Sequence, residues 1–210
     1  DVQPGGLPLR LTQRALHLRP LGIEPIVGSL SPAGPLTDRL EAAGIETFAC
    51  NARGPADVSC LARLASVIRR INPDLIHASL FHANLACRLV ARLDRPRPLI
   101  TSTVTIERER SWHLWLEAAT IGLSDLHVAN SNAVAVHLRE DLGFPANRLC
   151  TIRNGIDLRK IDAAAPIDRL RHGISPNQKL IIWAGRMDPV KNLSVLIETV
   201  ARLRIDFDVR

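Results

Sequence analysis

Short apolar runs alternate along most of the chain with longer segments in which apolar residues recur every three or four positions. The short runs have the length of buried β-strands, and they cover residues 22–28, 44–50, 74–78, 98–104, 125–129 and 148–153. The longer segments have the period of amphipathic helices, and they cover residues 7–18, 36–43, 58–71, 80–93, 112–123 and 133–142. Strands that alternate with helices through short links predict an α/β fold, in which a parallel sheet carries helices on both faces.

The pattern changes after residue 153, which predicts a domain boundary. Asn154 and Gly155 favour a turn, and residues 166–178 are polar and contain proline and glycine. A new strand is then predicted at 179–184, a helix at 188–203 and a further strand at 205–209. Because two strands and one helix cannot bury a core, we expect residues 156–210 to be a linker and the truncated start of a second Rossmann-like domain. Residues 1–155 are expected to be a first Rossmann-like domain that lacks its first strand.

Composition narrows the class of protein. Hydrophobic residues make up 46% of the chain and charged residues 23%, which is typical of a globular protein. The longest apolar run, at 180–185, is too short to cross a membrane. The net charge is +6, but the arginines are scattered and there are no tyrosines and only three tryptophans for base stacking, so nucleic acid is not an expected partner.

The four cysteines form no C-x-x-C pair, which argues against a zinc or redox motif. We interpret them as reduced, mostly buried thiols of a cytoplasmic protein.

The most informative stretch is Trp183-Ala-Gly-Arg-Met-Asp-Pro-Val-Lys-Asn-Leu193, which follows a predicted buried strand and leads into a helix. Ligands of α/β folds bind at such strand ends. Gly185 permits a tight turn, Arg186 can form a bidentate contact with phosphate oxygens, and Lys191 can place a positive charge near the helix N-terminus. The stretch therefore predicts a diphosphate site; the alternative is that Arg186 and Lys191 are solvated loop charges.

This stretch resembles the G-R-x-x-P-x-K-N signature of glycosyltransferase family 4, whose members have two Rossmann-like domains in the GT-B arrangement. Further motifs of that family have similar counterparts here, in the same order along the chain. They are the glycine loop Pro4-Gly5-Gly6, the segment Asp74-Leu-Ile-His-Ala-Ser-Leu-Phe-His-Ala83, the segment Val128-Ala-Asn-Ser-Asn-Ala-Val134 and the hinge Arg153-Asn-Gly-Ile-Asp157.

The resemblance implies a retaining glycosyltransferase of GT-B fold. Its first domain would bind the acceptor and its second would bind a nucleotide-sugar, UDP- or GDP-linked. Arg186 and Lys191 would hold the diphosphate and stabilise the leaving nucleotide in place of a metal ion, so no metal or other cofactor is expected. Gly185 belongs to the same site, and Gly5 and Gly6 would let the first loop approach the diphosphate or the acceptor.

The resemblance also implies an acceptor site in the first domain. His77 ends a predicted strand and His82 begins the next helix, so their imidazoles would contact the acceptor; the alternative is that each is a structural hydrogen-bonding residue. Thr105 stands where many relatives carry a histidine, and Arg153 stands where a hinge proline is usual.

Two glutamates of the first domain have the same spacing as a glutamate pair of the family, and we interpret this as a coincidence. Glu109 and Glu117 have the E-x7-E spacing of the family's sugar-binding glutamates, but they lie in the wrong domain. We interpret them as a partly exposed helix face that pairs with neighbouring arginines.

Arg108, Arg110, Trp112 and Trp115 form a basic-aromatic cluster. It could contact an anionic or lipid-linked acceptor or the inner membrane surface. The alternative is a helix with a buried tryptophan and an exposed basic side.

We therefore expect an enzyme of cell-surface polysaccharide or glycoconjugate synthesis, located in the cytoplasm or peripherally on the cytoplasmic membrane face, with the 210 residues inactive by themselves. Two alternatives stay open. One is a sugar-nucleotide epimerase of the same architecture, and the other is a non-catalytic, flavodoxin-like ligand-binding module.

Overall fold

The chain divides into two compact units, Asp1–Asn154 and Gly155–Arg210, called unit 1 and unit 2 below. The computed structural model describes residues 5–54, 56–93, 95–106, 110–185 and 187–205. The predicted strand at 205–209 lies almost wholly outside the described residues.

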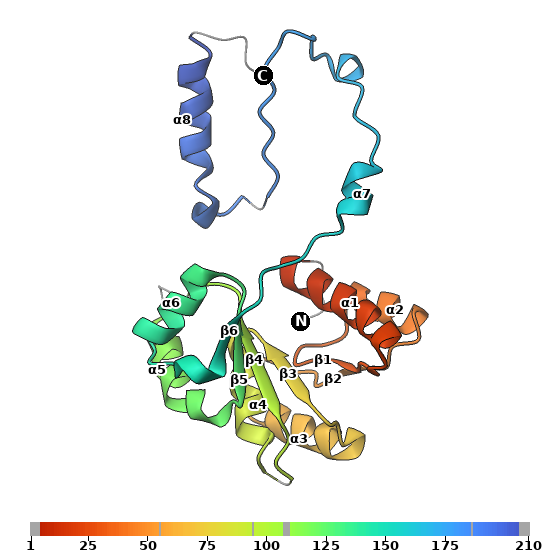
Figure 1. Ribbon diagram of the computed structural model, residues 1–210, viewed down its shortest axis with the longest axis vertical. Helices are drawn as coiled ribbons and strands as arrows, with labels where there is room; N and C mark the ends of the chain where they lie inside the picture. Colours follow the sequence, from red (N-terminus) through yellow and green to blue (C-terminus); the bar gives the residue numbers. More distant parts are fainter. Residues whose placement is uncertain (1–4, 55, 94, 107–109, 186, 206–210) are drawn as a thin grey trace. The chain divides into compact units, whose positions relative to one another are not determined.

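Unit 1 alternates strands and helices, as the sequence predicts (Figure 1). Its strands are β1 (Val27–Ser29), β2 (Thr47–Ala49), β3 (Ile76–Ser79), β4 (Leu99–Thr103), β5 (Leu126–Ala129) and β6 (Leu149–Thr151). Its helices are α1 (Gly6–Leu18), α2 (Pro35–Ala42), α3 (Ser59–Ile71), α4 (Phe81–Val90), α5 (Ser111–Thr120) and α6 (Asn132–Glu140). Short 3₁₀ turns follow α1 at Arg19–Leu21 and α5 at Ile121–Leu123, and one precedes β6 at Ala146–Arg148.

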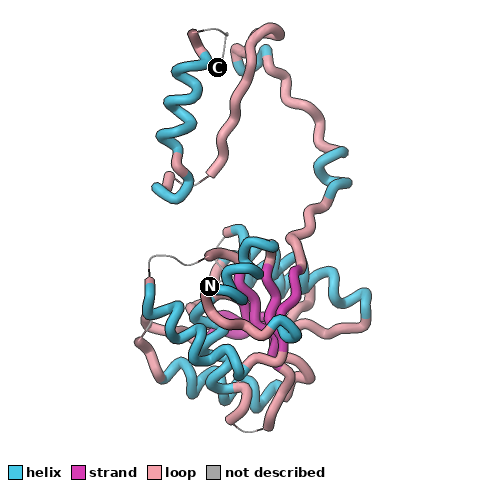
Figure 2. The backbone as a smooth tube through the Cα atoms, turned by 60° about the vertical axis from the view of Figure 1, so that its left-hand side comes forward, coloured by secondary structure: helices cyan, strands magenta, loops and turns pink. Residues whose placement is uncertain are grey.

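All strand pairs described in unit 1 are parallel, but they form two sheets instead of one. β1 pairs with β2, and β3, β4, β5 and β6 follow one another in a four-stranded sheet. The strands are drawn in magenta in Figure 2. The edge strands β1 and β3 line opposite parts of one largely apolar cavity of about 210 Å³. We call this cavity the inter-sheet slot. The absence of a first strand stays a prediction.

The helices bury three separate sets of core residues. α3 and α4 pack on β3 and β4 through a cluster that includes Leu64, Ile68, Ile76, Val90 and Leu99. α6 covers β5 through Val134 and Leu138, whereas α1 and α2 form a separate cluster around Ala15 and Leu40.

Local interactions mark the end of α3 and the start of α6. Asn72 follows α3 with φ 50°, in the left-handed conformation that stops a helix before Pro73. The Ser131 hydroxyl accepts a hydrogen bond from the Val134 N–H at 3.2 Å and caps α6. Gly143, with φ 68°, follows the end of α6.

Unit 2 departs from its predicted elements. It contains α7 (Leu158–Asp162), short 3₁₀ turns at Leu170–His172 and Pro189–Lys191, and α8 (Leu193–Leu203). The predicted strand at 179–184 is wrong: apart from an isolated bridge at Lys179 the segment is unpaired, and Ile182 is 71% exposed. A strand needs a neighbour, and no strand is assigned elsewhere among the described residues of unit 2. The predicted helix start at residue 188 is also wrong. Asn192 adopts φ 48°, which is outside the helical range, and α8 begins at the next residue, Leu193.

Candidate functional site

The carboxyl ends of β3 and β4 lie at one edge of the four-stranded sheet, because neighbouring parallel strands run in the same direction. The predicted acceptor residues of unit 1 lie on or just after these strands, but the prediction that His77 ends a strand is wrong, because β3 continues to Ser79. His77 lies in β3, His82 lies in the first turn of α4, and Thr105 lies two residues beyond β4. The contacts of these residues divide them into two groups.

His77 contacts α1 and β4. Its Nδ1 lies 3.3 Å from Arg14 Nη1, and its Nε2 lies 2.5 Å from Ser102 Oγ. Desolvation by the surrounding atoms, with the adjacent Arg14 charge, lowers the pKa of His77 to about 4, so the ring is neutral at pH 7 although the residue keeps an exposed surface. Because Arg14 can only donate, we assign Nδ1 as the acceptor and Nε2–H as the donor to Ser102.

His82 belongs to an aromatic cluster with Phe81, Trp112 and His113. The His82 ring lies edge-on to Phe81 at 5.2 Å and to His113 at 5.6 Å. Phe81 stacks on His113 at 3.8 Å between centroids and contacts Trp112 edge-on at 5.6 Å. Partial burial lowers the pKa of His82, as do the nearby His113 and Arg110, which favours a neutral ring. We keep the name aromatic cluster for these four residues.

Thr105 lines a cavity at the carboxyl end of β4, which we call the β4 cavity. Its volume is about 190 Å³, and its walls come from the loop after β4 and from the starts or inner faces of α4, α5 and α6. Phe81 and His113 of the aromatic cluster are among its lining residues, so the cavity and the cluster are continuous. The structure thus places Thr105 in the same cavity wall as Phe81 and His113, the ring partners of His82. His77 instead lines the inter-sheet slot.

The interpretation of α5 as a helix with one buried tryptophan is wrong. Trp112 is 52% exposed and Trp115 is 69% exposed, and the buried residues of α5 are His113 and Glu117. Arg110 is exposed just before the helix. Arg108 and Glu109, which complete the predicted cluster and the predicted glutamate pair, lie outside the described residues.

Glu117 is buried, contrary to the predicted exposed helix face. Its carboxylate lies 2.9 Å from Nη2 of Arg88 in α4, and the Arg88 side chain is fully buried. Arg88 also donates hydrogen bonds to Ser124 Oγ at 2.8 Å and to Thr120 and Thr101 at 3.3 Å. The ion pair therefore joins α4, α5 and β4 behind the β4 cavity, which Glu117 lines.

His127 continues this buried polar network across the sheet. Its Nδ1 lies 2.6 Å from Thr101 Oγ1, and its Nε2 lies 3.0 Å from Thr103 Oγ1. Burial, followed by the charge of Arg88, lowers the pKa of His127 to about 3, so this ring is neutral. Sequence reasoning missed the network, although Arg88 within an apolar helical run was a signal for a buried partner.

Gly5 and Gly6, the described glycines of the first loop, offer backbone groups and no side chains. Gly5 is the N-cap of α1, in an extended conformation with φ −172°, and its carbonyl accepts a hydrogen bond from the Leu9 N–H. A Cβ added to Gly6 would come no nearer than 4.0 Å to the Arg10 side chain. Space is therefore free beside Gly6, where the resemblance expects a ligand to approach.

The predicted diphosphate site lies in unit 2 and is described only in part. Lys191 ends the 3₁₀ turn at Pro189–Lys191, where its N–H donates to the Asp188 carbonyl at 2.8 Å, and the residue is exposed. A Cβ on Gly185 would lie 2.9 Å from the Trp183 ring, so glycine is favoured here by close packing. Arg186 lies outside the described residues.

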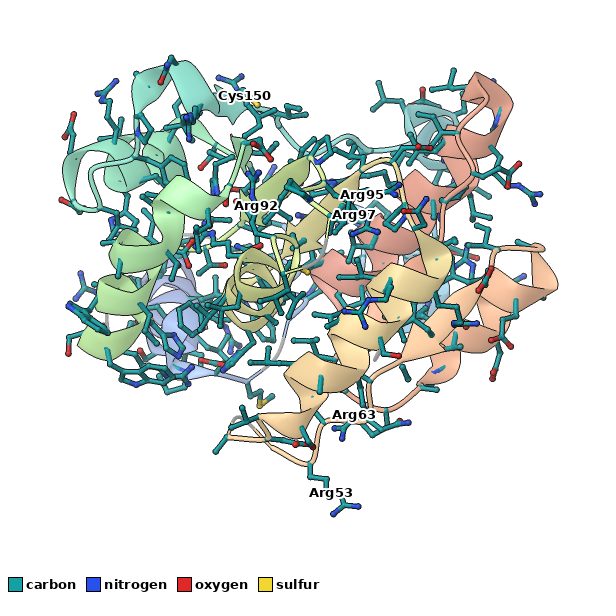
Figure 3. All side chains as sticks on the ribbon, turned by 90° about the horizontal axis from the view of Figure 1, so that it is seen from below. Arg53, Arg63, Arg92, Arg95, Arg97 and Cys150 are labelled. Atoms are coloured by element: carbon teal, nitrogen blue, oxygen red, sulfur yellow. The ribbon has the colours of Figure 1, made fainter. Side chains whose placement is uncertain are left out.

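Several arginines of unit 1 have partners at the opposite, amino end of the strands. Figure 3 shows Arg95 and Arg97 side by side and Arg92 apart from them, all from the segment that precedes β4. Arg92 pairs with Asp125 at 2.8 Å, and Arg97 donates to Asn72 Oδ1 at 2.9 Å. These side chains tie loops together away from the β4 cavity.

Within the described parts of the chain, no group of three or more histidine, cysteine or acidic side chains could hold a metal ion. No helix described there is long and apolar enough to cross a membrane. The cysteines are free thiols, with Cys50, Cys60 and Cys87 buried and Cys150 half-buried, as the sequence predicts.

Parallel strands with interposed helices, and candidate ligand groups at the strand ends, define a Rossmann-like α/β protein. Residues 4–160 match the model of Glycosyltransferase Family 4, which covers most of the chain. The chain therefore belongs to this family, and the family assignment made from its motifs is confirmed.

Individual relatives agree with this assignment. The chain is 28% identical over 138 residues to a D-inositol 3-phosphate glycosyltransferase of Thermobifida fusca, matching 65% of this chain and 29% of the relative. A glycosyltransferase of Rickettsia africae superimposes with a TM-score of 0.75 at 22% identity, over 95% of this chain and 54% of the other. HepE of Anabaena, solved with UDP, gives 0.78 at 23% identity, over 96% and 56% of the two chains. These structures confirm the GT-B-type fold. The chain spans about half of the length of these two structures and less than a third of the length of the curated relative.

Proposed function

We propose that the full-length protein transfers a glycosyl group from a nucleotide-sugar to an acceptor, with retention of configuration at the anomeric carbon. The observation that supports it most directly is the family match over residues 4–160. The ordered motifs extend this support into unit 2, where the Gly185–Asn192 stretch has the family's signature residues.

The sugar donor is proposed to be UDP- or GDP-linked. UDP bound to the Anabaena HepE protein supports the uridine form. In this proposal Arg186 and Lys191 bind the diphosphate, with Gly185 allowing the backbone to turn beside it. As the sugar–phosphate bond breaks, negative charge grows on the leaving nucleoside diphosphate. Two cations stabilise that charge, which is the role that a metal ion plays elsewhere. Gly5 and Gly6 give the diphosphate or the acceptor access to the first loop.

The acceptor is proposed to bind unit 1 at the carboxyl ends of β3 and β4. Neutral imidazoles can hydrogen-bond to sugar hydroxyls without attracting a counter-ion, and the lowered pKa values of His77 and His82 favour the neutral form. The Thr105 hydroxyl is exposed in the loop after β4 and can donate and accept. We place the reaction in cell-surface polysaccharide or glycoconjugate synthesis, in the cytoplasm or at the cytoplasmic membrane face.

Calorimetric titration of UDP and GDP into the full-length protein tests the sugar-donor site. We expect micromolar binding of one nucleotide, weakened at least about 10-fold, or about 1.4 kcal/mol, by Arg186→Ala and by Lys191→Ala. Lys179→Ala is the matched control, because Lys179 is an exposed lysine of unit 2 outside the motif. Binding that neither motif substitution weakens would disprove the assignment of the diphosphate site.

A radiolabelled-sugar transfer assay on the same protein separates the reaction classes. Transfer to added acceptor supports a glycosyltransferase. Interconversion of the nucleotide-sugar without transfer would instead identify an epimerase, and nucleotide binding without turnover would identify a binding module.

A further inference from the structure

The β4 cavity has a chemical character that a sugar ring does not need. Its lining is largely apolar, and includes Phe81, Val104, Ile106, Leu114, Leu138 and Leu142. A sugar presents several hydroxyl groups, each of which costs free energy when buried without a hydrogen-bond partner. An apolar group, in contrast, gains free energy in proportion to the surface that it removes from water.

The ionisable groups at the cavity wall already have partners. Glu117 is neutralised by Arg88 at 2.9 Å. His137 lies 2.5 Å from Asp141 through its Nδ1 atom. Among the described lining residues these two pairs leave little net charge, although the protein as a whole carries +6.

The exposed indole ring of Trp112 adjoins the cavity. Phe81 and His113, which line it, contact Trp112 with centroid distances of 5.6 and 4.0 Å. Trp112 and Trp115 keep more than half of their surfaces exposed on α5. Tryptophan is favoured where apolar and aqueous surroundings meet, because its ring is apolar and its N–H is polar.

We propose that the β4 cavity binds the hydrocarbon portion of an amphiphilic acceptor, whose polar end lies toward Thr105. This inference rests on the proposed glycosyl transfer and names the class of acceptor. A water molecule takes about 30 Å³ of liquid, and a methylene group is of similar size, so the volume of about 190 Å³ holds roughly six carbons of an unbranched chain. A longer chain would continue past the cavity, along the exposed indoles of α5.

A series of n-alkyl glucosides, from methyl to decyl, tests the proposal by calorimetry on the full-length protein below micelle-forming concentrations. Each methylene that enters the cavity should tighten binding about fourfold, the factor that corresponds to about 0.8 kcal/mol. The gain should level off near six carbons, when the cavity is full. Affinity that does not depend on chain length would overturn the proposal.

Leu114→Phe fills the cavity, and Leu116→Phe is the matched control. Both leucines are half-buried residues of α5, but only Leu114 lines the cavity. We expect Leu114→Phe to abolish the dependence on chain length and Leu116→Phe to keep it. Leu142→Phe, on another wall, repeats the test without a change in α5 if Leu114→Phe does not fold. A chain-length dependence that survives both filling substitutions would also overturn the proposal.

Two further measurements separate this inference from the proposed function and from the source of the chain. Titration of UDP and GDP into the same variants reports on the sugar-donor site alone. If the unsubstituted protein binds neither nucleotide, the proposed glycosyl transfer is refuted, but the chain-length result for the cavity is unaffected. A long-chain alkyl glucoside in phosphatidylcholine vesicles represents an acceptor held in a membrane. Binding of the dissolved glucosides or of the vesicle-held glucoside supports the proposal if Leu114→Phe abolishes it. Which of the two binds more tightly shows whether the acceptor is dissolved or held in a membrane.

Discussion

Breaking the ion pair between Arg88 and Glu117 should lower the free energy of unfolding strongly, whereas replacing both residues by apolar ones should change it little. Arg88→Met removes the guanidinium and leaves the Glu117 carboxylate, 8% exposed, without its counter-charge. Removing one partner of a buried pair typically destabilises a protein by about 3–5 kcal/mol, because the remaining charge is desolvated and uncompensated. The lost hydrogen bonds to Ser124, Thr120 and Thr101 are included in that figure.

The double substitution Arg88→Met with Glu117→Leu should be less harmful than Arg88→Met alone. It removes both charges and leaves apolar side chains of similar size, a change that is often neutral or stabilising. The hydroxyls that Arg88 contacts keep other partners: Thr101 donates to Ser124 at 2.9 Å, and Thr120 donates to the Leu116 carbonyl at 2.7 Å. We expect the double variant to be at least about 2 kcal/mol more stable than the Arg88→Met variant.

Urea unfolding of the full-length protein, followed by far-ultraviolet circular dichroism, measures these differences. Arg92→Met is the matched control, because Arg92 forms an ion pair of similar length with Asp125 but with both side chains partly exposed. An exposed pair contributes only about 0–1 kcal/mol. Equal losses for Arg88→Met and Arg92→Met, or a double variant as unstable as the sum of its singles, would refute the assignment of a buried, mutually dependent pair.

Two further outcomes follow from the described side chains. Burial lowers the pKa of His127 from its usual 6.5 to about 3, so the folded protein binds fewer protons than the unfolded chain and stability should fall as the pH drops from about 6.5 toward 3. His127→Gln should reduce this slope, by up to about 1.4 kcal/mol per pH unit, in urea unfolding across that range; an unchanged slope would contradict a buried neutral ring. Burial also raises the pKa of Cys50 to about 11 and of Cys87 to about 12, so a thiol reagent at pH 8 should modify the half-buried Cys150 first, as peptide mass spectrometry of the labelled protein would show. Faster labelling of Cys50 would contradict this order.

The secondary structure of unit 1 follows closely from periodicity and punctuation. Residues 58–71 carry an apolar stripe at helical spacing and end before Asn72-Pro73, and α3 occupies Ser59–Ile71. The hydroxyl of Ser131 caps α6, and such an N-cap is a local interaction between neighbouring residues. Such signals can be read from sequence since the groups involved lie within one or two turns.

Contacts between distant segments explain what the sequence did not reveal. Glu117 has a polar identity that suggests exposure, but Arg88, from another helix, supplies the charge that allows its burial. The apolar run at 179–184 suggests a buried strand, yet Ile182 is largely exposed because burial depends on neighbours that the run itself cannot provide. The β4 cavity likewise arises from three helices and a loop, so no single motif indicated it.

The inter-sheet slot has a consequence for how the protein associates. β1 and β3 each pair on one side only, and both border the same cavity of about 210 Å³. The buried hydroxyls of Ser29 and Ser79, on these two strands, have no hydrogen-bond partner among the described residues. Unpaired strand edges act as templates for another strand. An extended segment that lies in the inter-sheet slot can pair with both edges at once, and it would join the two sheets into one.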